Sequence, residues 1–63
     1  MKLFDTVKLL NDYNELPAGT EGTIVLEYDG SCDAVEVFDS EGDTIDVITI
    51  PASSLELVSE FSN

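Results

Sequence analysis

The sequence predicts an all-β fold, a small barrel of about five strands that spans residues 1–63 as a single domain. Two observations predict it. Stretches rich in β-branched residues alternate with polar residues at the two-residue period of a strand. Glycine and proline separate these stretches at positions that suit tight turns. A chain of 63 residues has room for one thin hydrophobic core.

The first strand is expected at Thr6–Leu9, because Val7 and Leu9 alternate with polar neighbours. A one-turn helix is the alternative for this brief apolar run. The polar segment Asn11–Leu16 is expected to form a loop. Pro17-Ala18-Gly19 predicts a turn, because proline presets its φ angle and glycine accepts a positive one.

Three strands joined by tight turns are expected next, at Thr23–Tyr28, Asp33–Phe38 and Thr44–Ile50. Gly22 starts the first of them or makes a bulge, and Asp29-Gly30 and Glu41-Gly42 supply the turns. One face of the strand at Thr23–Tyr28 is expected to carry Ile24, Leu26 and Tyr28. The strand at Thr44–Ile50 has apolar residues on both faces, with Ile45 and Val47 opposite Ile48 and Ile50. This predicts a strand buried on both sides for part of its length.

Pro51 ends the fourth strand, because proline has no N–H to donate. Ala52–Leu55 is too short for an α-helix and predicts a single 3₁₀ turn. A last strand is expected at Glu56–Val58, followed by a tail, 59–63, that is expected to fray. This order of strand, long loop, three strands, 3₁₀ turn and strand is typical of an SH3-like barrel.

The charge of the chain is strongly negative. Fourteen acidic residues against two lysines give a formal charge of −12, although 43% hydrophobic content is typical of a globular domain. Such a charge repels nucleic acid and anionic membrane, and it attracts a basic protein. With no apolar run approaching about 18 residues and no signal peptide, we expect a cytoplasmic protein without a membrane partner.

No catalytic apparatus is visible in the sequence, and we expect a protein that is not an enzyme and has no cofactor. Histidine is absent, which removes the commonest general base and metal ligand. Cys32 lies between acidic residues, which disfavour a reactive thiolate, so it is interpreted as a passive, partly buried side chain. Tyr13 and Tyr28 are too few for a polyproline groove and are interpreted as packing residues.

Eight acidic residues fall between positions 27 and 46 with no basic residue among them. They either keep the surface soluble or form a docking face for a basic protein partner. A nucleic-acid mimic is a special case of the docking face. The candidate contacts are Glu27, Glu36, Asp39, Glu41, Asp43 and Asp46.

Two alternatives to a docking face remain open. Asp39-x-Glu41-x-Asp43 places carboxylates in alternation, but its glycine and twelfth residue do not fit a calcium loop, so no metal site is expected beyond weak cation binding. The chain could instead be a structural subunit of a larger complex. That version predicts an exposed apolar patch of Phe4, Leu10 and Phe61.

Four stretches resemble a group of short bacterial proteins described as domain of unknown function 4926. They are Lys2–Leu9, Leu16–Val25, Val35–Phe38 and Leu55–Val58. The resemblance implies an SH3-like barrel and no established activity. By analogy with two-gene pairs, it also suggests an acidic antitoxin or inhibitor that neutralises a toxic or nuclease-like neighbour.

Overall fold

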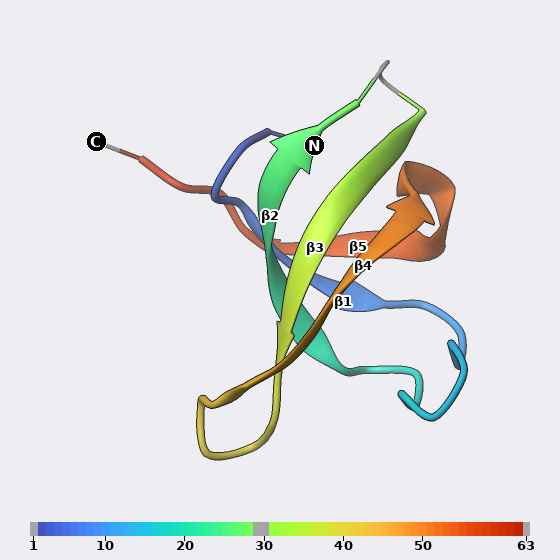
Figure 1. Cartoon of the computed structure of the whole chain (residues 1–63). Coiled ribbons are helices and arrows are strands. Elements are labelled where there is room, and N and C mark those ends of the chain that lie inside the picture. The colour runs from blue at the N-terminus through green and yellow to red at the C-terminus, as the bar shows by residue number, and fades with distance from the viewer. Residues whose placement is uncertain (1, 29–30, 63) are drawn as a thin grey trace.

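Five antiparallel strands form one sheet in a computed structural model that describes residues 2–28 and 31–62 (Figure 1). The order of strands across the sheet is β4-β3-β2-β1-β5. A 3₁₀ turn, Ala52–Ser54, precedes the last strand, as the sequence predicts. The strands are β1 Thr6–Leu9, β2 Glu21–Glu27, β3 Cys32–Phe38, β4 Thr44–Pro51 and β5 Leu55–Ser59.

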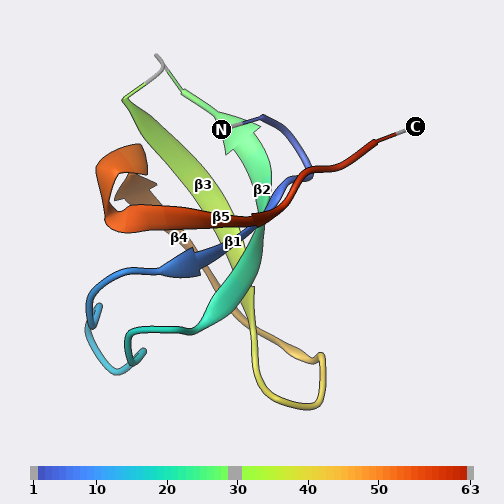
Figure 2. The same cartoon turned by 180° about the vertical axis from the view of Figure 1, so that it is seen from behind.

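The sheet is strongly bent, which makes the fold consistent with a small barrel. The β1 and β5 strands cross the direction of β3 in two opposite views, and the long curved β2 belongs to both halves (Figures 1 and 2). The predicted all-β class, strand order and 3₁₀ turn are therefore confirmed. Within the described part of the chain, no helix has the length and apolar character needed to cross a membrane.

The core lies on the concave side of the sheet. Strands β1, β3 and β4 contribute to it at alternate positions, as the two-residue period requires, and β2 and β5 contribute one side chain each. Tyr13 and Leu16 of the first loop pack against this core, which confirms the packing role expected of Tyr13. The buried side chains are Val7, Leu9, Ile24, Val35, Val37, Ile48, Ile50 and Leu55.

Two of the predicted turns lie in the described residues and are confirmed. Gly19 has a φ of 92°, and Thr20 N–H donates to the carbonyl of Pro17 at 3.1 Å. Gly42 has a φ of 87° in the β3–β4 turn. The turn expected at Asp29-Gly30 lies outside the described residues.

Strand β4 is buried on one side only, so the prediction of burial on both faces is wrong. Ile48 and Ile50 face the core, whereas Ile45 is 49% exposed and Val47 is 54% exposed. Val47 and Thr49 are exposed because no second layer of described residues covers the outer face of β4, and Ile45 is the extra residue where the register with β3 shifts. Apolar residues on both faces of a strand therefore do not require two buried faces here.

Strand β2 also departs from the predicted face. Ile24 is buried, but Leu26 and Tyr28 are exposed. The register shifts between Ile24 and Leu26, which pair with the consecutive residues Val35 and Ala34. This β-bulge inserts one residue and turns the following side chains to the other face of the sheet.

Asp5 ties the two ends of the chain together. It is only 2% exposed, and its two carboxylate oxygens accept hydrogen bonds from Lys2 N–H at 2.9 Å and Phe61 N–H at 3.0 Å. The Phe4 and Phe61 rings meet edge to face, with centroids 5.5 Å apart. The tail expected to fray is therefore anchored at Phe61.

The Phe61 and Lys2 N–H donors lower the pKa of Asp5 below its ordinary value of 3.8, against the opposing effect of burial. A lowered pKa stabilises the fold at pH values above 3.8, and this stabilisation is lost as the pH falls through the lower folded-state value. We expect Asp5→Asn to be less stable than the wild type at neutral pH. The difference should shrink in acid, as urea unfolding between about pH 2 and pH 6 would show. A difference that does not change with pH would contradict this role.

Candidate functional site

The densest group of carboxylates lies in the β3–β4 turn. Asp39, Glu41 and Asp43 are all exposed, and one oxygen of each lies within 4.8 Å of the others. The turn is closed by Asp39 N–H, which donates to the carbonyl of Asp43 at 2.9 Å. At such a separation each pair of carboxylates repels by about 1 kcal/mol in water.

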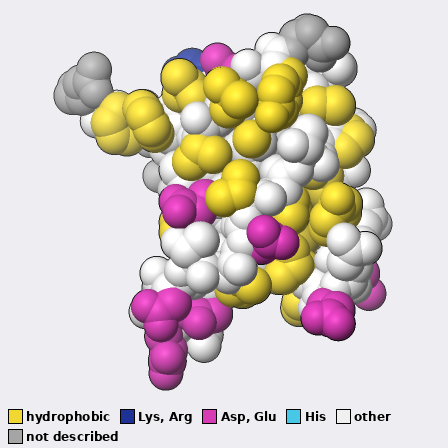
Figure 3. Space-filling view, in the orientation of Figure 1, with side chains coloured by type: hydrophobic (Ala, Val, Ile, Leu, Met, Phe, Trp, Pro, Cys, Tyr) yellow, Lys and Arg dark blue, Asp and Glu magenta, His cyan; other side chains and the backbone are white. Residues whose placement is uncertain are grey.

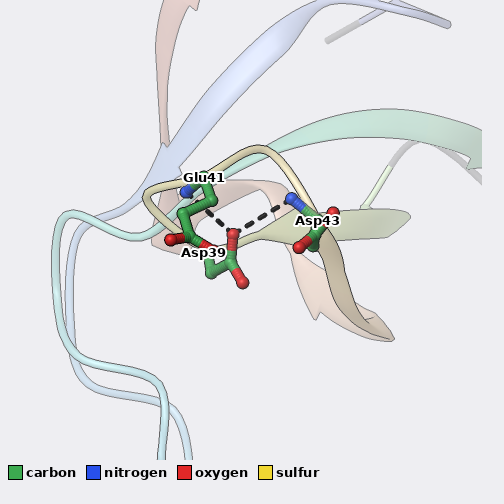
Figure 4. A group of neighbouring side chains, drawn as sticks. All are labelled: Asp39, Glu41 and Asp43. Atoms are coloured by element: carbon green, nitrogen blue, oxygen red, sulfur yellow. Dashed lines mark hydrogen bonds between the residues drawn. The ribbon is translucent and has the colours of Figure 1, made fainter.

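Asp39 holds the turn in shape. Its Oδ1 accepts hydrogen bonds from the backbone N–H groups of Glu41 at 2.9 Å and Asp43 at 3.0 Å (Figure 4). Aspartate often braces a turn in this way. The turn itself therefore fixes the position of the Asp39 carboxylate.

We expect Asp39→Ala to lower the free energy of unfolding by about 1 kcal/mol, because two backbone donors lose their shared acceptor. Asp39→Asn keeps an acceptor oxygen and should retain most of that stability. Urea unfolding of both variants tests this. Equal losses in the two variants would show that the oxygen does not brace the turn.

Glu36 and Asp46 lie near this turn but on opposite faces of the sheet. Glu36 is half-buried, and its carboxylate accepts a hydrogen bond from Thr44 Oγ1 at 3.1 Å. Asp46 pairs across the sheet with Val37, whose side chain faces the core. The Asp46 carboxylate accepts a hydrogen bond from the N–H of Val47 at 2.8 Å, which satisfies one backbone donor.

Glu27 is separated from the other five candidate residues. It pairs with Asp33 near the start of β3, whereas Asp39 follows the end of that strand. Six residues of extended chain correspond to about 20 Å. The structure therefore brings Asp39, Glu41 and Asp43 together, places Glu36 and Asp46 beside the same turn on opposite faces of the sheet, and leaves Glu27 at the opposite end of β3.

Asp33 belongs to the core rather than to the acidic surface. It is 3% exposed, and its Oδ2 has no hydrogen-bond partner among the described residues. Its alternation with Val35 and Val37 places it on the core side of β3. The acid-rich stretch thus contributes fewer charges to the surface than the sequence suggests. The alternation with Val35 and Val37 was the available signal, although an aspartate in a strand is normally exposed.

Two further acids were missed as site residues. Glu15 lies in the first loop and Glu21 at the start of β2. Both line an open groove that Asp39 also lines. The available signal was the segment Asn11–Glu21, which holds Asp12, Glu15 and Glu21 without a basic residue. Asp12 is used internally, because its Oδ1 accepts the N–H of Ala18 at 2.8 Å.

Only one of the two lysines lies near this groove: Lys8 pairs across the sheet with Glu21. Lys8 is in β1, and its Nζ is 3.7 Å from Oε2 of Glu56 in β5. Lys2 precedes β1. Cys32 is half-buried with a free thiol, which fits a passive role.

These features define a small acidic all-β protein with a bent five-stranded sheet and carboxylates concentrated at one end. The chain belongs to the family described as Domain of unknown function (DUF4926), which matches residues 3–57. No curated protein and no solved structure matches this chain.

Proposed function

We propose that this chain is a non-catalytic interaction module that binds a basic protein partner through its carboxylate-rich end. One observation carries the proposal: three candidate carboxylates gather in the β3–β4 turn, Glu36 and Asp46 flank it on the two faces of the sheet, and neither lysine lies in β3, β4 or that turn. Such an unneutralised end steers a basic protein toward it over distances of about 10 Å or more, depending on salt. Desolvation of apolar side chains near the contact then slows dissociation.

An inhibitor or antitoxin is the form of this function that most needs such a surface. Covering the basic groove of a nuclease-like protein requires dense negative charge, because that groove is built to hold phosphates. In this form the partner is toxic when expressed alone, and co-expression of this chain restores growth. A general adaptor gives no such rescue.

The test is retention of proteins from an extract of the source cells on immobilised wild-type protein. The matched variant carries Glu36→Gln, Asp43→Asn and Asp46→Asn. Basic proteins should be retained by the wild type at low salt, and lost both at high salt and on the variant. A protein that the variant retains equally well would contradict docking at this end.

A structural subunit is the second candidate, and the pair of Phe4 and Phe61 favours it. Both rings are exposed at the surface although they contact each other. Leu10, which the same hypothesis groups with them, follows β1 whereas Phe4 precedes it, so the strand lies between Leu10 and the two rings. If the chain is a subunit, Phe4→Ser should abolish its assembly into the larger complex, as gel filtration of extracts would show.

A further inference from the structure

Two acidic projections stand at one end of the molecule, the segment 15–21 and the β3–β4 turn, and a groove separates them. Its volume is about 720 Å³, and it lies between the segment 15–21 and the residues 38–40 and 45. Apolar side chains of Leu16, Phe38 and Ile45 line it. In Figure 3 acidic side chains stand on both projections at the lower end of the view, with hydrophobic side chains recessed between them.

The groove continues along β4. A second hollow, lined by Tyr13, Asp46 and Ile48 among others, shares Glu15, Leu16 and Ile45 with the first. The two hollows therefore form one track beside β4. This strand is at the end of the sheet, so its outer edge has no strand partner among the described residues.

We infer that this track binds a short extended segment of a basic protein, with apolar residues set between lysines or arginines. This inference rests on the proposed function and names the surface and the ligand. The acids Glu15, Asp39 and Asp46 lie along the track, and no lysine lines it. An extended segment suits the open edge, because its alternate side chains point in opposite directions.

Charge complementarity decides between possible occupants. A second copy of this chain brings a charge of −12 and is repelled, as is nucleic acid. A purely apolar segment would leave the acidic rim without partners. A segment carrying both basic and apolar side chains satisfies the rim and covers the recessed hydrophobic residues.

Ile45 and Val47 provide a matched pair of positions for the test. Both are β-branched, are about half exposed and lie in β4, but only Ile45 lines the track. Threonine at either site keeps β-branching and strand propensity while removing apolar surface. Ile45→Thr should weaken ligand binding about five-fold, and Val47→Thr should leave it unchanged.

The experiment is an NMR titration of the ¹⁵N-labelled protein at low salt with the synthetic peptide KKLKLKK, with KKSKSKK as the control. We expect KKLKLKK to bind more tightly. The amide signals that move should be those of Leu16, Ala18–Thr20, Phe38 and Ile45. Thermal unfolding of both threonine variants confirms that they remain folded, and mapping on the wild type does not depend on them.

The outcomes separate the two proposals. Equal binding of both peptides, with no effect of Ile45→Thr, would overturn the track while leaving docking by charge intact. Signals that move only around Phe4 and Phe61 would also overturn it. Failure of both peptides to bind at low salt would contradict the proposed function itself.

Discussion

Replacing Gly22 with alanine is expected to destabilise the fold by about 2–3 kcal/mol. A Cβ at this position would lie 2.6 Å from the carbonyl oxygen of Glu36 and 2.6 Å from Cγ1 of Val35. The oxygen belongs to the backbone of β3, so relief requires β2 and β3 to move apart. A domain of this size has a total stability of only about 3–9 kcal/mol. Urea unfolding should therefore show a midpoint at a much lower urea concentration than that of the wild type.

Gly19→Ala is the control for Gly22→Ala. Gly19 has a φ of 92°, but an added Cβ meets nothing within 4 Å. Its cost is the strained backbone alone, about 1 kcal/mol. Equal losses of stability in the two variants would show that β2 and β3 do not approach as closely at Gly22 as the structure indicates.

Neutralising Glu36, Asp43 and Asp46 together is expected to slow association with a basic partner about ten-fold at low salt. The same change removes repulsion around the β3–β4 turn and should raise the free energy of unfolding by about 1 kcal/mol at low salt. Glutamine and asparagine keep acceptor oxygens for Thr44 Oγ1 and Val47 N–H, so the local hydrogen bonds survive. Stopped-flow binding and thermal unfolding measure the two effects.

Glu56→Gln with Glu60→Gln is the control for location. These residues lie in and just after β5, the edge strand opposite β4 in the sheet order. For each charge removed, this pair of substitutions should slow association with the basic partner much less than the substitutions at Glu36, Asp43 and Asp46. Equal slowing per charge would mean that total charge, rather than its concentration near the turn, governs association.

The strand order was predictable because its signals are local. Alternation of β-branched residues and the turn residues at Gly19 and Gly42 are visible within short windows of sequence. The burial of individual faces was less predictable. The bulge after Ile24 has no marker in a continuous β-branched run, and the exposure of Val47 depends on whether a second layer covers that face of the sheet.

The candidate site divides in the same way. Asp39, Glu41 and Asp43 were predicted together because one tight turn joins them, and the structure brings them together. The groove was not predicted, because it depends on where the first loop packs relative to β4. Glu15 and Ile45 are far apart in the sequence, and nothing local indicates that they line one surface.

Thermal unfolding of the wild-type protein with and without hexalysine tests the central claim most directly, because it requires no identified partner. At low salt the carboxylates around the β3–β4 turn repel one another, so a small polycation should raise the unfolding temperature. Excess sodium chloride should raise it as well and remove the additional effect of hexalysine. An unfolding temperature that responds to neither would contradict an unneutralised acidic end that awaits a basic protein.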